Sequence, residues 1–101
     1  MGSNKRAPLP YRTDRTKNFE KAWKRYNKSG RYDMQAAAVA MNLVTNRNPV
    51  PAEYRDHELT GEWAGFRELH IGGDFLLVYR VDEKNEIIYF TDLGTHAELF
   101  E

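Results

Sequence analysis

The sequence predicts an α+β fold in which an N-terminal antiparallel helix pair packs on an antiparallel sheet of three or four strands. Two observations support this prediction. Apolar side chains recur at helical spacing between residues 14 and 46, and from residue 63 onward they form short strand-like runs separated by turn residues. Because the helices precede the strands and do not alternate with them, we expect them on one face of the sheet.

Each helix is predicted from a cap, an apolar face and a stop signal. The first begins at Thr13 or Asp14 and ends before Gly30. Its buried face is expected to comprise Phe19, Ala22, Trp23 and Tyr26, and its opposite face carries Lys17, Lys21, Lys24, Arg25 and Lys28. The second begins near Asp33 and ends at residues 46–49. Its apolar residues are Met34, Ala37, Ala38, Met41 and Val44.

The second half is predicted to form a meander. Strands are expected over residues 63–71, 75–79 and 87–91. Gly72-Gly73 and residues 82–85 mark the turns, and residues 49–59 have the composition of a loop. Residues 9–12 would add an edge strand, a position in which prolines are tolerated. Thr95 is expected to cap a short C-terminal helical turn over residues 97–100.

The hairpin has a consequence for the polar residues beside it. If Gly72-Gly73 is the turn, His70 opposes Phe75, and strict alternation sends His70 and Asp74 to opposite faces of the sheet. A β-bulge at the turn would change that relation.

Size and composition indicate one domain. The chain has 101 residues, and we expect a single domain over residues 1–101 with residues 1–8 as a flexible lead. The absence of cysteine excludes disulfides and thiolate metal ligands. No apolar run approaches 18 residues and no signal peptide is recognisable, so a cytoplasmic protein without membrane contact is expected.

The net charge of zero conceals a strong polarity. Residues 1–55 carry 12 Lys and Arg against 4 Asp and Glu, whereas residues 56–101 carry 3 against 11. Such asymmetry is typical of nucleic-acid contact, but it would also arise if the two halves attract each other in the fold.

The histidines are the strongest chemical signal. His57, His70 and His96 all lie in the second half, near Arg67 and Asp74. Histidine exchanges protons at neutral pH. RNA can be cleaved through its own 2′-OH by a base, an acid and a cation at the phosphate, and these residue types supply those parts.

Other interpretations of these residues remain open. A metal site is disfavoured because no HxH or HExxH pair is present, and we expect neither a metal nor another cofactor. Each histidine alone is compatible with a structural or surface role. A nucleophilic triad lacks a cysteine or a serine in a strained turn. Phe100 either completes the core or stacks on a base.

Four segments of the second half form a long and specific pattern. They are Pro-Ala-Glu-Tyr-Arg-Asp-His at 51–57, Leu-Thr-Gly-Glu-Trp-Ala-Gly-Phe-Arg-Glu-Leu-His at 59–70, Asp-Phe-Leu-Leu-Val-Tyr at 74–79 and Gly-Thr-His-Ala-Glu-Leu-Phe at 94–100. This pattern closely resembles the YafQ branch of the RelE superfamily. It covers about half of the chain, and the order of the preceding elements agrees.

The resemblance implies a bacterial toxin of a type II toxin–antitoxin operon. Such toxins enter the ribosomal A site and cut mRNA without a metal. A cognate antitoxin inhibits them, and the complex of the two binds operator DNA. The resemblance also implies the fold predicted above.

The same resemblance assigns residues by position. The catalytic set is His57, His70, Asp74 and His96. His96 and His70 would share general acid and base duty with Asp74 orienting one of them, and His57 and Arg67 would hold the phosphate. Phe100 would stack on a base, and Arg80 is a further candidate for the phosphate.

The chain departs from the family pattern at Asp92. Relatives often carry an arginine two residues before the Gly-Thr-His segment, and a carboxylate cannot stabilise a phosphate. This keeps open an alternative in which the chain is a weak or inactive member that only binds antitoxin and regulates its operon. A nuclease acting on free RNA is a third and less favoured reading, because a small site grips flexible RNA poorly.

Overall fold

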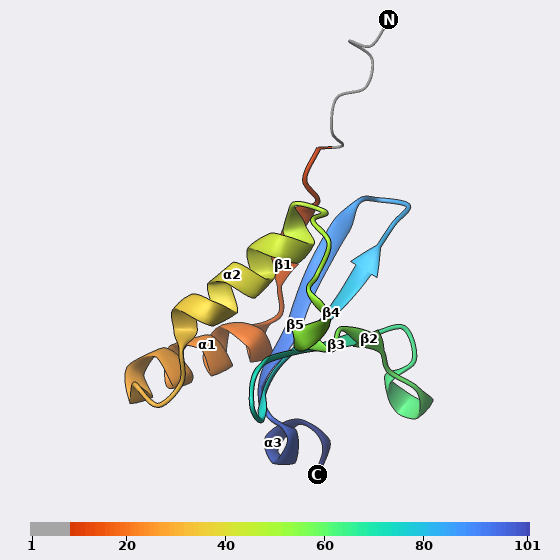
Figure 1. The fold of residues 1–101 in the computed structure, drawn as a ribbon. Helices are drawn as coiled ribbons and strands as arrows, with labels where there is room; N and C mark the ends of the chain where they lie inside the picture. The colour runs from red at the N-terminus through yellow and green to blue at the C-terminus, as the bar shows by residue number, and fades with distance from the viewer. Residues whose placement is uncertain (1–8) are drawn as a thin grey trace, which may run out of the picture.

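Two helices cover one face of a five-stranded sheet. The computed structural model describes residues 9–101, so the flexible lead expected at residues 1–8 lies outside the described residues. Helices α1 (Lys17–Ser29) and α2 (Met34–Thr45) lie side by side against the sheet in Figure 1, and the short helix α3 (His96–Phe100) follows the last strand. The predicted α+β class is confirmed, although one short strand, at Arg12–Arg15, precedes the helices.

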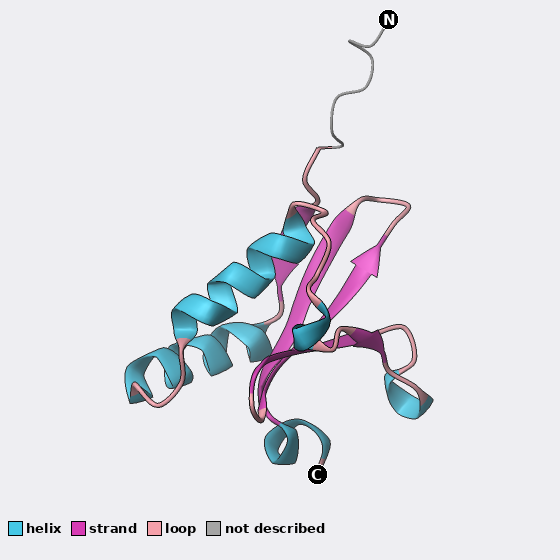
Figure 2. Cartoon of the chain, in the orientation of Figure 1, coloured by secondary structure: helices cyan, strands magenta, loops and turns pink. Residues whose placement is uncertain are grey.

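The sheet is larger than expected and contains one parallel pair. Its order is β1-β5-β4-β3-β2. The strands are β1 (Arg12–Arg15), β2 (His57–Glu58), β3 (Arg67–Gly72), β4 (Phe75–Asp82) and β5 (Ile87–Thr95). The predicted edge strand therefore exists but begins at Arg12, and it pairs parallel with β5, while the other pairs are antiparallel. Figure 2 shows the sheet in magenta beside the cyan helices.

Helix α1 begins later than predicted. Thr13 and Asp14 are part of β1, and the cap is Thr16, whose hydroxyl accepts a hydrogen bond from the Phe19 amide at 3.0 Å. The same hydroxyl donates to the carbonyl oxygen of Thr91 at 2.5 Å. Gly30 ends the helix as predicted, with a φ of 69° that suits glycine.

Helix α2 agrees with the prediction except for one residue of its buried face. Asp33 caps it by accepting from the Ala36 amide at 2.9 Å. Ala37, Met41 and Val44 are buried as expected, but Ala40 is buried in place of Ala38, which is exposed. The buried stripe thus follows the i, i+3, i+4, i+7 spacing, which Ala38 does not share with Ala37.

The strand expected from Trp63 begins only at Arg67. Residues Gly61–Trp63 form a 3₁₀ turn, and Gly65 has a φ of 93° that interrupts any extended run. The segment expected to be a loop contains a second 3₁₀ turn at Ala52–Tyr54 and the short strand β2. Strand β5 continues to Thr95, four residues beyond the prediction.

The β3–β4 hairpin contains a β-bulge, which interrupts the strict alternation of side chains along β3. His70 pairs with Leu76 and Gly72 pairs with Phe75, with a register shift between His70 and Gly72. The expected pairing of His70 with Phe75 is therefore wrong. The extra residue places Asp74 in the turn itself, where its side chain is free of the alternation of either strand.

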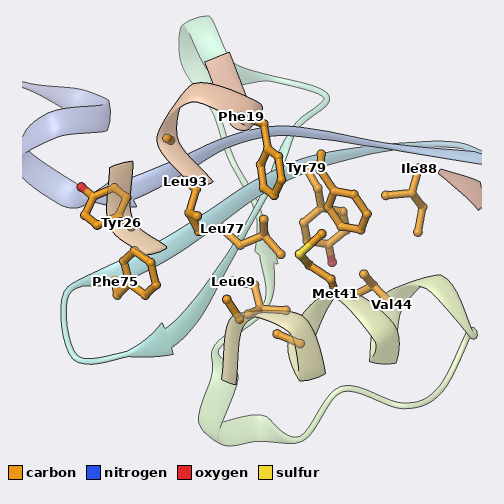
Figure 3. Close-up of a cluster of buried hydrophobic side chains, with 14 residues drawn as sticks. Phe19, Tyr26, Met41, Val44, Leu69, Phe75, Leu77, Tyr79, Ile88 and Leu93 are labelled. Atoms are coloured by element: carbon orange, nitrogen blue, oxygen red, sulfur yellow. The ribbon is translucent and has the colours of Figure 1, made fainter. Parts of the chain in front are cut away.

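The core lies between the helices and the sheet, as Figure 3 shows. Phe19 of α1 packs on Phe90 with ring centroids 5.8 Å apart, and Tyr26 packs on Phe75 at 5.0 Å. Burial of each such side chain stabilises the fold by roughly 1.5–3 kcal/mol. No helix within residues 9–101 is long and apolar enough to cross a bilayer.

Candidate active site

The sheet face opposite α1 and α2 carries the polar residues of the candidate site. Leu69 of β3 joins the core under the helices, so its neighbours Glu68 and His70 point to the other face. His57 of β2 pairs directly with Glu68, which brings it to the same face. Two of the three histidines are therefore assembled by the pairing of β2 with β3.

Glu68 joins these two histidines. Its side chain is only 9% exposed, and its Oε2 lies 3.2 Å from Nε2 of His57 and 3.4 Å from Nε2 of His70. The two imidazole centroids are 6.2 Å apart. A buried carboxylate needs partners of this kind, since an isolated one is costly. The sequence reasoning missed Glu68, although its place two residues before His70 in a strand was a usable signal.

Both ring nitrogens of His57 have oxygen partners. Nδ1 donates a hydrogen bond to the carbonyl oxygen of Arg55 at 2.6 Å. Nε2 lies 3.2 Å from Oε2 of Glu68. The ring is therefore held on both sides within a His57–Glu68–His70 group.

A hollow of about 380 Å³ connects this group to the C-terminal helix. Its walls include His57, Thr60, Trp63, Glu68, His96 and Phe100. Phe100 packs edge-on against Trp63 with centroids 5.3 Å apart, and His96 lies 5.2 Å from the Phe100 ring. His57, His96 and Phe100, which are distant in the sequence, thus meet at one cavity.

Helix α3 sets the position of His96. Thr95 and Glu98 form a capping box, so His96 is the first residue of the helix. The carboxylate of Asp74 accepts a hydrogen bond from the His96 backbone amide at 3.2 Å. Asp74 therefore fixes this histidine through its backbone, and the imidazole itself contacts Glu101 with Nδ1 to Oε2 at 3.4 Å.

Arg67 lies on the helix side of the sheet, away from the hollow. Its Nε is 3.2 Å from Oδ1 of Asp56, which also accepts a hydrogen bond from the Tyr79 hydroxyl at 2.7 Å. Burial and the bond to Asp56 raise the pKa of the Tyr79 hydroxyl above its usual range. These contacts anchor the residue next to His57, so the structure places Arg67 in a support for the site and not at a bound phosphate.

The remaining candidates also lie outside the hollow. Arg80 stacks its guanidinium on Tyr89, 4.4 Å from the ring centroid. Asp92 lines a separate depression with Lys21 and Arg25 of α1. Among residues 9–101, no group of three or more histidine, aspartate or glutamate side chains is arranged to hold a metal ion.

The family model for YafQ, described as a bacterial toxin of type II toxin–antitoxin systems, matches residues 11–101. The chain belongs to the YafQ toxin family. Its relatives include the mRNA interferase toxin YafQ of Escherichia coli K12, which is 36% identical over 93 residues. That match covers 91% of this chain and 94% of the relative.

Solved structures of YafQ-like toxins share the fold. The E. coli DinJ–YafQ toxin–antitoxin complex contains a chain with a TM-score of 0.82 and 32% identity, over 92% of this chain and 100% of that one. A metal-bound toxin of Helicobacter pylori gives a TM-score of 0.82 at 31% identity, over 89% and 99% of the two chains. The resemblance inferred from the sequence is thereby confirmed.

Proposed function

We propose that this YafQ-family toxin is a ribosome-dependent endoribonuclease that cuts mRNA in the A site by acid–base chemistry through the 2′-OH. The observation that carries the proposal is the hollow in which His57, His96 and Phe100 meet beside buried Glu68. The E. coli relative is named an mRNA interferase, which agrees with this chemistry.

Cleavage through the 2′-OH needs one group to take the hydroxyl proton and another to protonate the leaving 5′-oxygen. We assign these duties to His96 on one wall of the hollow and to the His57–Glu68–His70 group on the other. Asp74 serves as a positioning residue for His96. No arginine lines the hollow within residues 9–101, so protonated imidazole supplies the positive charge at the phosphate.

Phe100 and Trp63 suit the recognition of a base. Their edge-on contact leaves aromatic surface at the wall of the hollow, next to His96. Stacking of a base on an aromatic side chain contributes about 1–3 kcal/mol without fixing the sequence. Phe100 would thus hold the nucleotide while the histidines act on its sugar and phosphate.

The proposed partners follow from the relatives and from charge. The E. coli toxin forms a complex with DinJ, so a cognate antitoxin is proposed here, with operator DNA bound only through the complex. The cationic residues of the first half suit contacts with ribosomal RNA, whose phosphates dominate the affinity. We propose that antitoxin binding and ribosome binding both take place in the cytoplasm.

Growth arrest tests the proposal in cells. Expression of the chain without an antitoxin should stop growth, and the His96→Ala variant at equal abundance should not. Arrest by both proteins would contradict a catalytic role of the hollow.

A second candidate is a weak or inactive member that binds antitoxin and regulates its operon. The observation in its favour is Asp92, which stands where relatives often carry an arginine. It predicts no arrest by the unmodified chain, although the chain still binds its antitoxin. The position of Asp92 beside Lys21 and Arg25, outside the hollow, favours the catalytic proposal instead.

A further inference from the structure

A second depression lies on the other side of α3 from the hollow. It has a volume of about 390 Å³ and is bounded by the end of α1, the turn into α2 and the start of α3. Its walls include Arg25, Tyr26, Ser29, Arg31, Thr95 and Glu98. Thr95 directly precedes His96, so this α1–α3 pocket and the candidate active site share a wall.

The pocket contains a buried hydroxyl without a partner. Tyr26 is 6% exposed, and its hydroxyl is the one buried side-chain polar atom within residues 9–101 that makes no hydrogen bond. Figure 3 shows this hydroxyl directed toward the C-terminal segment of the chain. A buried hydroxyl of this kind costs free energy unless something accepts its proton.

Gly94 lies close to the Tyr26 hydroxyl. A Cβ at this position would lie 3.2 Å from the Tyr26 oxygen and 3.3 Å from Oε1 of Glu98. Any larger residue would therefore crowd the region into which the hydroxyl points.

The charges of the pocket favour an anion. Arg31 stacks near the ring of Tyr32 at 5.9 Å and has no carboxylate partner in the described part of the chain. Arg25 contacts Glu98 only at 3.7 Å, between two exposed side chains. Glu98 is itself engaged in the capping box of α3. Two arginines therefore face one carboxylate that already has partners.

We propose that the α1–α3 pocket binds a backbone phosphate of RNA, with Arg31 and Arg25 as cations and the Tyr26 hydroxyl as a donor. The proposal rests on the proposed action on ribosome-bound mRNA. The phosphate belongs either to the mRNA, next to the cut nucleotide, or to ribosomal RNA. Arginine and a hydroxyl donor are the usual contacts to such phosphates, which position a strand without reading its sequence.

The test measures binding to ribosomes without cleavage. Dissociation constants are determined for ribosomes carrying a 2′-O-methylated mRNA in the A site and for ribosomes without mRNA. Arg31→Gln is compared with Lys17→Gln, which removes one charge from the first turn of α1 outside the pocket. We expect Arg31→Gln to weaken binding about tenfold and to reduce the salt dependence by roughly one phosphate contact, beyond any effect of Lys17→Gln.

Tyr26→Phe isolates the hydroxyl. It should weaken binding by a similar factor while leaving the melting temperature unchanged or raised, because the deleted hydroxyl has no partner in the fold. If the hydroxyl contacts no phosphate, Tyr26→Phe should leave both the melting temperature and the binding to ribosomes unchanged. Unchanged binding would refute the proposal.

The two ribosome samples identify the source of the phosphate. An Arg31 effect that persists without mRNA assigns ribosomal RNA, and one that needs mRNA assigns the mRNA. Equal effects of Arg31→Gln and Lys17→Gln, or no binding by the unmodified protein, would refute phosphate binding in the pocket.

Cleavage of unmodified mRNA is recorded separately. Cleavage without an Arg31 effect rejects only the pocket, whereas Arg31-dependent binding without cleavage rejects only the proposed reaction.

Discussion

At the scale of single residues, the candidate site contains a buried carboxylate that was not among the predicted residues. Glu68 contacts His57 and His70 through one oxygen atom and is almost shielded from water. This one carboxylate therefore holds both imidazoles in a single group on the sheet face.

Glu68→Gln should reduce mRNA cleavage by roughly 10²-fold, because the amide keeps the shape of the side chain but removes its charge. The pH–rate profile should change shape as well, which loss of a purely structural contact would not cause. Glu62→Gln is the matched control, since Glu62 is exposed in the neighbouring 3₁₀ turn. An unchanged rate and profile for Glu68→Gln would remove Glu68 from the mechanism.

Tyr79→Phe tests the support beneath His57. Loss of its hydrogen bond to Asp56 should lower the free energy of unfolding by about 1–2 kcal/mol at neutral pH, measured by urea titration. Tyr89→Phe is the control, because no hydrogen bond of the Tyr89 hydroxyl occurs among residues 9–101.

The pH dependence of that loss has a defined sign. Because burial and the bond to Asp56 raise the pKa of Tyr79, the folded protein holds this proton more tightly than the unfolded chain. The stabilisation is complete below pH of about 10, the ordinary tyrosine pKa, and is lost as the pH rises above it. The stability difference between the native protein and Tyr79→Phe should therefore shrink in that range. A constant difference would contradict the assigned network.

At the scale of elements, one hydroxyl supplements the apolar core in attaching α1 to the sheet. The Thr16 hydroxyl caps α1 and also donates to Thr91, where β5 has a register shift. One oxygen thus fixes both the start of α1 and its attachment to the strand that leads to His96.

Thr16→Ala should lower the free energy of unfolding by about 1–2 kcal/mol, the upper range for a helix cap, because the second hydrogen bond is lost with the first. Thr16→Ser keeps both bonds and should remain close to the native protein. Chemical denaturation of the two variants decides the matter. Equal stability of the alanine and serine variants would show that the hydroxyl is not needed.

The elements differ in how well the sequence predicts them. Helix α2 and strands β4 and β5 have apolar patterns that burial enforces, so they were predictable. Strand β1 was placed too early because its residues, Arg12–Arg15, are all exposed and no apolar pattern marks their pairing with β5. The bulge after His70 depends on how a turn packs, which alternation does not describe.

The candidate site residues show the same division. The histidines were identifiable from their chemistry and from the family pattern. Arg67 was expected at the phosphate, yet it stands one residue from Glu68 in a strand and so faces the other side of the sheet. Strict alternation along the strand would have placed Arg67 on the face opposite His70. It would have placed Glu68 on the same face as His70.

At the scale of the whole molecule, the sheet separates two tasks. One face buries Leu69 and Tyr79 beneath the helices, and the other presents Glu68, His70 and the hollow. The main core and the candidate site thus lie on opposite faces of the same strands. Helix α3, held by Asp74 and its capping box, brings His96 and Phe100 over the second face.

The most direct test is a translation reaction with a defined mRNA, in which 5′ ends are mapped by primer extension for the native protein and for His96→Ala. We expect cuts at fixed codon positions that require ribosomes, with a rate lowered about 10²–10⁴-fold in the variant. Circular dichroism should show both proteins equally folded. Cleavage by His96→Ala at the native rate, or cuts that form without ribosomes, would contradict the proposed reaction.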